Sequence, residues 1–179
     1  LEYLKVDYRI HSPENIPRDG GRYIFASNHP LGGLDGLIIT SLIGREMGDV
    51  RFVVNDLLMF VKPLEPIFVP VSKVGKMSQD YAGRINSAFE SDAQVLYFPA
   101  GLCSRLIEGK IVDLEWKKTF VTKAMEYNRG IIPLHFSGRN SMFFYRLAKL
   151  RKFLGIKFNI EMIFLVDELF RQKGKTFDM

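Results

Sequence analysis

Apolar residues along the chain follow two alternating patterns. Short runs rich in β-branched and aromatic residues favour strands, and longer segments with apolar residues at helical spacing favour amphipathic helices. The predicted strands are residues 22–27, 50–55, 66–71, 93–99, 130–138 and 158–166. The predicted helices carry four apolar stripes: Leu34, Leu37, Ile38, Leu42; Tyr81, Ile85, Ala88, Phe89; Trp116, Phe120, Ala124, Tyr127; and Phe143, Leu147, Leu150, Leu154.

This alternation of strand and helix predicts an α/β fold with a mainly parallel β-sheet flanked by helices. A chain of 179 residues suits one domain with a sizeable core, so we expect a single domain over residues 1–179. Residues 12–21, with two prolines and two adjacent glycines, predict a loop before the first strand. Because the chain begins with Leu1 rather than methionine, it is also compatible with a fragment of a longer protein.

Composition and charge narrow the possible settings and partners. Apolar content of 47% and charged content of 25% argue against disorder, and no run reaches the roughly 20 apolar residues of a membrane span. The single Cys103 cannot form an internal disulfide, which favours a reducing compartment. A net charge of +5 favours anionic partners such as phosphate, a membrane surface, nucleic acid or an acidic carrier protein. Much of the excess lies in a segment without Asp or Glu: Arg139, Arg146, Lys149, Arg151, Lys152 and Lys157.

The strongest candidate chemistry lies on the turn after the first predicted strand. His29 can accept a proton near neutral pH, and Asp35 can orient its ring and stabilise the imidazolium. Residues six apart lie on different faces of a continuous helix, so the two side chains can meet only across a turn. Pro30, Gly32 and Gly33 supply such a turn.

A second candidate turn, residues 98–105, follows the predicted strand from Ala93 to Tyr97. Ligands in open α/β sheets bind outside the carboxyl ends of strands, where both turns are expected. Each turn alone has a plainer interpretation. Asp35 suits a helix start through the helix dipole, and an arginine after a Pro-x-Gly turn, as at Arg105, is usually solvated.

Together the two turns resemble the glycerolipid acyltransferase family, which includes lysophosphatidate acyltransferases. The matching positions are Asn28, His29 and Asp35; Phe98, Pro99, Gly101, Ser104 and Arg105; and Ile131, Ile132, Pro133 and Leu134. More loosely, residues 134–141 and 167–170 resemble a bacterial branch that acylates lyso-aminolipids such as ornithine or glycine lipids, and hemolysin-related relatives.

Three positions depart from the family pattern. Five residues separate His29 from Asp35 where the family has four, Ala100 replaces a glutamate, and Val71 stands in place of an arginine, with Lys73 two residues on. The family associates the missing groups with the glycerol phosphate of its acceptor. The departures therefore weaken the prediction of a lysophosphatidate acceptor more than the prediction of acyl transfer.

The resemblance implies transfer of a fatty acyl group from an acyl carrier protein or coenzyme A thioester to a hydroxyl of a lysolipid. His29 and Asp35 would be catalytic. The candidate substrate-binding residues are Asn28, Gly32, Gly33, Lys73, Phe98, Pro99, Gly101, Ser104 and Arg105. Backbone amides around Gly32, Gly33 or Gly101 are candidate oxyanion donors, since glycine permits close approach. The fork of Arg105 is a candidate ligand for a phosphate or carboxylate.

The resemblance implies no bound cofactor or metal, and it places the protein at the inner face of the cytoplasmic membrane as a peripheral protein. A groove for the acyl chain could be lined by Leu31, Leu57, Leu58, Met59 and Phe60, each of which equally suits the core. Two other functions stay open: a thioesterase or esterase that uses the same histidine, and a catalytically silent module that binds lipid or membrane.

The remaining candidate residues favour structural roles. We expect His135 in the core or sheet, His11 exposed and Cys103 incidental, and the three histidines lack the spacing of a zinc site. Residues 142–157 suit either a helix at a membrane interface or a helix packed on the sheet with a solvated basic face. No nucleic-acid recognition motif accompanies the positive charge.

Overall fold

The computed structural model shows a five-stranded sheet in which every pair of neighbouring strands is parallel, in the order β4-β3-β5-β2-β8. The residues that the structure describes are 2–55, 58–59, 61–71 and 79–179. The strands are β2 (Tyr23–Ser27), β3 (Val50–Asn55), β4 (Phe68–Val71), β5 (Gln94–Tyr97) and β8 (Gly130–Leu134). Pro133 is accommodated because β8 is an edge strand.

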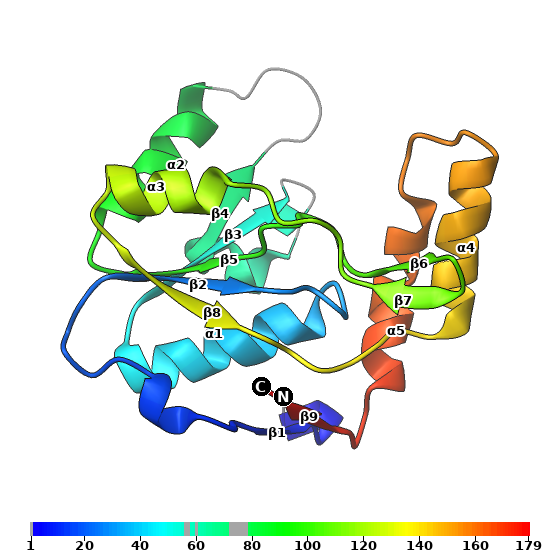
Figure 1. Cartoon of the computed structure of the whole chain (residues 1–179), viewed down its shortest axis with the longest axis horizontal. Coiled ribbons are helices and arrows are strands. Elements are labelled where there is room, and N and C mark those ends of the chain that lie inside the picture. The colour runs from blue at the N-terminus through cyan, green and yellow to red at the C-terminus, as the bar shows by residue number, and fades with distance from the viewer. Residues whose placement is uncertain (1, 56–57, 60, 72–78) are drawn as a thin grey trace.

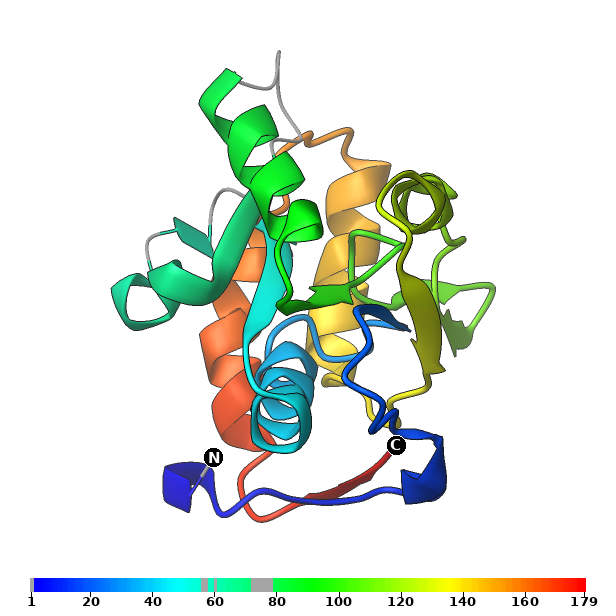
Figure 2. The same ribbon diagram turned by 90° about the vertical axis from the view of Figure 1, so that its left-hand side faces the viewer.

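Helices cover both faces of this sheet (Figure 1). Helix α1 (Leu34–Met47) lies on one face, and α2 (Gln79–Glu90) and α3 (Thr119–Glu126) lie on the other. Because side chains of a strand alternate between faces, Phe25 packs in the cluster around α1 while Ile24 packs in the cluster under α2 and α3. Figure 2 shows the same layers from the side.

A small second sheet lies beyond α1, where the first and last parts of the chain meet. Strand β1 (Asp7–Arg9) pairs in parallel with β9 (Thr176–Asp178), and Phe177 packs into the cluster around α1. Two short 3-10 helices, η1 (Glu2–Leu4) and η2 (Pro13–Asn15), flank β1 in the sequence. A third, η4 (Lys62–Ile67), directly precedes β4 of the main sheet and contacts β3.

The carboxyl end of the main sheet carries a separate layer (Figure 1). The hairpin β6 (Arg105–Ile107) and β7 (Lys110–Val112) turns through Glu108 and Gly109, both at positive φ. Three further elements pack beside it: α4 (Met142–Phe153), η5 (Ile160–Phe164) and α5 (Leu165–Arg171). We call residues 142–171 the C-terminal lobe.

The structure confirms the predicted α/β class and five of the six predicted strands: β3 has the predicted bounds, and the other four are one to four residues shorter than predicted. The sixth prediction was wrong, because residues 160–171 form η5 and α5 instead of a strand. Glu161, in the middle of that apolar segment, is completely buried and pairs with two arginines, whereas Ile163 and Val166 are exposed. The apolar run is compatible with a strand or a helix, and the ion pairs of Glu161 with distant residues favour the helical structure.

Candidate active site

The turn after β2 brings His29 and Asp35 together. His29 Nδ1 lies 3.0 Å from Asp35 Oδ2; the carboxylate is fully buried, and the histidine side chain is 15% exposed. The additional residue between them is accommodated where the chain turns at Gly32, whose φ of +78° is unfavourable for other residues. The sequence-based expectation that the two groups converge is confirmed.

Asp35 is held by hydrogen bonds from the backbone of its own turn. Its Oδ2 accepts from the Leu31 amide at 2.9 Å, and its Oδ1 accepts from the amides of Gly33 and Gly36 at 3.1 and 2.9 Å. Burial alone would raise the pKa of Asp35, but the charge and hydrogen bond of His29 and the amides of Leu31 and Gly36 outweigh it, so the pKa lies below its ordinary value. Asp35 is therefore a fixed anion at neutral pH.

The fixed anion determines how the His29 ring is used. Because an ionised carboxylate only accepts hydrogen bonds, Nδ1 of the neutral ring carries the proton and Nε2 presents its lone pair. Phe98, from the second turn, stacks on the ring with centroids 3.9 Å apart and an interplanar angle of 22°. The ring is thus held by Asp35 at one edge and by Phe98 on one face.

The two predicted turns form one unit, since β2 and β5 are neighbouring parallel strands. The Ser104 amide donates to the His29 carbonyl at 3.2 Å. The Asn28 side chain bonds both the amide and the carbonyl of Phe136, at 2.7 and 3.0 Å. Asp113, just after β7, accepts from Asn28 Nδ2 at 3.1 Å and from Ser104 Oγ at 2.5 Å. Asn28 and Ser104 thus hold the turns in register.

Small residues let the C-terminal lobe approach the His29 turn closely. A Cβ placed on Gly32 would lie 3.0 Å from Leu165 Cδ2 and 3.2 Å from Cys103 Sγ. The Asn140 side chain also donates to the Leu31 carbonyl at 3.1 Å. Burial raises the pKa of the Cys103 thiol, which suits the predicted incidental role of this residue.

Arg105 points into the protein and pairs with a buried carboxylate. Its Nη2 lies 3.0 Å from Glu161 Oε1, its Nη1 bonds the Cys103 and Ser104 carbonyls, and its guanidinium lies over the Phe144 ring. Arg151 Nε approaches the other oxygen of Glu161 at 2.9 Å as an ion pair without hydrogen-bond geometry. This Arg105–Glu161–Arg151 cluster joins the second turn to the C-terminal lobe.

Other predicted residues have varied positions. Pro99 and Ala100 are buried within the second turn, and Gly101 adopts a φ of +66°. Lys73 lies outside the described residues, as do Leu57 and Phe60 of the suggested chain groove. Within that groove, Leu31 is buried, and Leu58 and Met59 pack against the core around α1.

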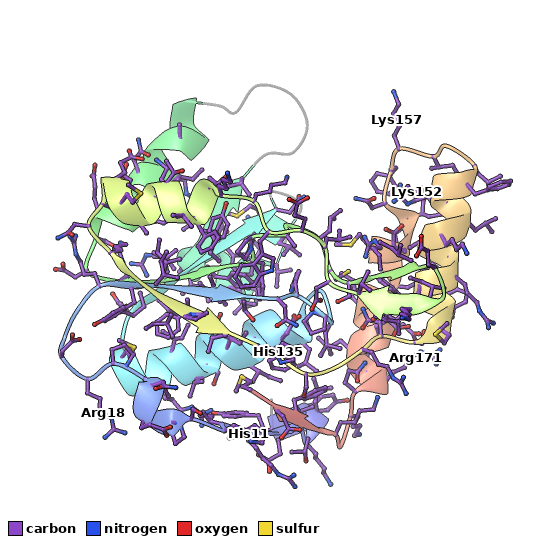
Figure 3. The ribbon with its side chains drawn as sticks, in the orientation of Figure 1. His11, Arg18, His135, Lys152, Lys157 and Arg171 are labelled. Carbon is purple, nitrogen blue, oxygen red and sulfur yellow. The ribbon has the colours of Figure 1, made fainter. Side chains whose placement is uncertain are left out.

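The remaining two histidines lie elsewhere on the surface (Figure 3). His11 is exposed, as expected, and lies 2.9 Å from Asp178. The expectation of a buried His135 was wrong, because β8 ends at Leu134 and the next residue is exposed beyond the strand. Across the described ranges, no three His, Cys, Asp or Glu side chains are grouped so that they could hold a metal ion.

Sequence reasoning missed Asp113, Glu161 and Phe136 as parts of this region. The hairpin before Asp113 had a usable signal, because Glu108-Gly109 between two short apolar runs suits a two-residue turn with positive φ at both positions. Glu161 had none, since its partners come from segments 56 and 10 residues away that only the fold brings together.

The fold and the paired turns define an acyltransferase domain. A family model described as acyltransferase matches residues 5–179, and the chain belongs to this family. It is 49% identical over 178 residues to the lyso-glycine lipid O-acyltransferase of Bacteroides thetaiotaomicron, covering 99% of this chain and 65% of the relative. It is also 49% identical over 180 residues to the protein of that name from Phocaeicola vulgatus, covering 100% and 64%. The chain thus spans just under two thirds of the length of these curated relatives.

Proposed function

We propose that this chain is the catalytic domain of a lysolipid O-acyltransferase, with His29 as general base and Asp35 as its orienting partner. The carrying observation is the 3.0 Å contact between His29 Nδ1 and the buried Asp35 carboxylate. Membership of the acyltransferase family and the names of the two relatives support the reaction class.

In the proposed reaction, His29 Nε2 takes the proton of a lysolipid hydroxyl as its oxygen attacks the thioester carbonyl. Asp35 stabilises the imidazolium that forms, at no reorganisation cost because its carboxylate is already fixed by three amides. The tetrahedral intermediate collapses by breaking the carbon–sulfur bond. The imidazolium then returns the proton to the departing thiolate, giving the ester and a free thiol.

The intermediate also needs donors for its oxyanion, and removing one such donor costs about 10²–10³ in rate in other enzymes. The Gly33 amide donates to Asp35 and the Gly101 amide donates to the Phe98 carbonyl, so these two predicted donors are already engaged. Gly32 is the remaining candidate among the three, and its amide lies on the same turn as His29.

The acceptor that we propose is a lyso-aminolipid, as the names of the relatives suggest. Ala100 supplies no carboxylate where the glycerolipid pattern has one, and the Arg105 guanidinium already pairs with Glu161. Both features disfavour a glycerol phosphate. The acyl donor would be acyl carrier protein or acyl-CoA, both of which present phosphate and suit a chain with a net charge of +5. With such an acceptor, the protein would act as a peripheral protein at the inner face of the cytoplasmic membrane.

A direct test incubates the purified chain with labelled acyl carrier protein or acyl-CoA thioester and one acceptor at a time: lyso-glycine lipid, lyso-ornithine lipid or lysophosphatidate. We expect an O-acylated aminolipid by mass spectrometry and little acylated lysophosphatidate. Release of free fatty acid at the same rate with and without acceptor would instead establish the thioesterase alternative. Lipid binding without turnover of any pair, in an acceptor screen extended to a bacterial lysolipid extract, would establish the silent module.

A further inference from the structure

Helix α4 turns its predicted apolar stripe away from the protein. The helix is anchored by Phe144, Tyr145 and Ala148, which are buried. At 100° per residue, the stripe of Phe143, Leu147, Leu150 and Leu154 is centred roughly 140° around the helix from that anchored face. Phe143, Leu150 and Leu154 are each more than half exposed. Residues 142–157 were compatible with a helix at a membrane interface or with a helix that packs its stripe on the sheet. The exposure of the stripe excludes the second arrangement.

The exposed apolar surface extends over the whole C-terminal lobe. Phe153 is 85% exposed, and exposed apolar side chains continue through the loop after α4 into η5 and α5. The surface includes Phe143, Leu150, Phe153, Leu154, Phe158 and Ile163. Scattered exposed apolar residues need no explanation, but a concentration of this kind on one lobe is typical of a protein or membrane contact.

Basic side chains border this apolar surface. Arg146 and Lys149 lie on the other exposed flank of α4, Lys152 lies in the last turn of the helix, and all three are exposed. Lys157 extends outward from the loop at the tip of the lobe (Figure 3). Residues 139–160 contain no acidic residue, so nothing within the segment offsets this charge. An apolar flank beside a basic flank suits an anionic lipid surface, because acyl chains and headgroups satisfy the two flanks separately.

The same lobe forms part of the wall of the candidate active site. Leu165 contacts the position of Gly32 in the His29 turn, and the buried Glu161 binds Arg105 of the second turn. Docking of the lobe on a bilayer would therefore place both turns next to the surface in which a lysolipid resides.

We propose that the exposed face of the C-terminal lobe, residues 142–166, docks the protein on an anionic lipid bilayer. Phe153, Leu150 and Ile163 insert among the acyl chains, and Arg146, Lys149, Lys152 and Lys157 contact anionic headgroups. The docking proposal rests on the proposed function in one respect only: it takes the acceptor to be a lysolipid that resides in the bilayer.

Vesicle co-sedimentation without substrates tests the apolar contact. Phe153→Ser should lower partitioning onto phosphatidylcholine–phosphatidylglycerol vesicles about tenfold, as expected for one lost aromatic insertion. Met125→Ser is the matched control, because Met125 is 80% exposed on α3 at a different part of the surface. Equal effects of the two substitutions would overturn the proposal.

The charge contribution has its own matched pair. Lys149→Glu should weaken binding to the anionic vesicles about tenfold and leave the weaker binding to pure phosphatidylcholine unchanged. Arg18→Glu, which changes an arginine at the opposite end of the molecule (Figure 3), should change neither by more than about twofold. The same loss for both variants would indicate attraction by net charge alone and would refute a defined surface.

Insertion is measured directly with a tryptophan probe. Fluorescence of Phe153→Trp should be quenched by brominated lipid, whereas Met125→Trp should match the wild-type signal of Trp116. No quenching of Phe153→Trp would overturn the proposed insertion. Conversion of a wild-type dimer to a monomer by Phe153→Ser, with unchanged vesicle binding, would assign the face to a second copy of the chain. Vesicle binding through Phe153 without any acyl transfer would refute the proposed function alone, and transfer without such binding would refute the docking surface alone.

Discussion

Glu161→Gln tests whether the Arg105–Glu161–Arg151 cluster holds the C-terminal lobe on the candidate site. Glu161 is completely buried, and the side chains of Arg105 and Arg151 are only 13% and 14% exposed. The substitution keeps the size of the side chain but leaves two poorly solvated cations facing a neutral amide. Removing one partner of a buried ion pair costs about 3–5 kcal/mol, which for a protein of this size lowers the unfolding midpoint by about 6–20 °C.

The assay is thermal and urea unfolding of the wild type, Glu161→Gln and a control, Asp167→Asn. The control breaks the 2.8 Å pair between Asp167 and Arg171, whose side chains are both more than half exposed, and should cost less than about 1 kcal/mol. A loss in Glu161→Gln no larger than in the control would show that the cluster does not stabilise the lobe.

Three further outcomes follow from the geometry around His29. Gly32→Ala should destabilise the protein by about 1–3 kcal/mol in urea unfolding, because its φ is +78° and Leu165 is close, whereas Gly44→Ala, at an exposed position of α1, should stabilise it. Since the pKa of Asp35 is lowered on folding, its stabilising contribution is present above about pH 4 and lost as pH falls through the folded-state pKa; Asp35→Asn should flatten this acid dependence of the unfolding free energy. Cys103 should resist alkylation until urea unfolds the protein; native labelling at the unfolded rate would contradict its burial.

The sheet and its first turn were predictable because they depend on local patterns. Strand β3 occupies the residues that its apolar run predicted, and Pro30, Gly32 and Gly33 indicated a turn that could join His29 to Asp35. The parallel α/β class does not by itself make β2 and β5 neighbours in the sheet. It does place the turns that follow both strands at the same edge of the sheet, where the carboxyl ends of the strands lie.

The predictions that failed depend on contacts between distant segments. The segment around Glu161 was expected to form a strand, but it forms η5, in which Glu161 joins a buried ion cluster. No local pattern indicated that Arg105 would pair with Glu161, and its predicted role in substrate binding stays a prediction. His135 was expected in the sheet because the apolar run continues past Leu134, although β8 ends there. On α4, the periodicity identified the apolar stripe, but it did not indicate that the opposite side of the helix is the one buried against the rest of the chain.

The most direct test of the central claim compares acyl transfer by His29→Gln and by His135→Gln. Glutamine keeps a polar side chain in place of His29 but cannot accept the hydroxyl proton, and general-base catalysis contributes about 10²–10⁴ in rate. With thermal unfolding confirming that both variants fold, we predict that kcat/KM falls at least about 100-fold in His29→Gln and stays near the wild-type value in exposed His135→Gln. Retention of near wild-type transfer by His29→Gln would contradict the role of the His29–Asp35 pair.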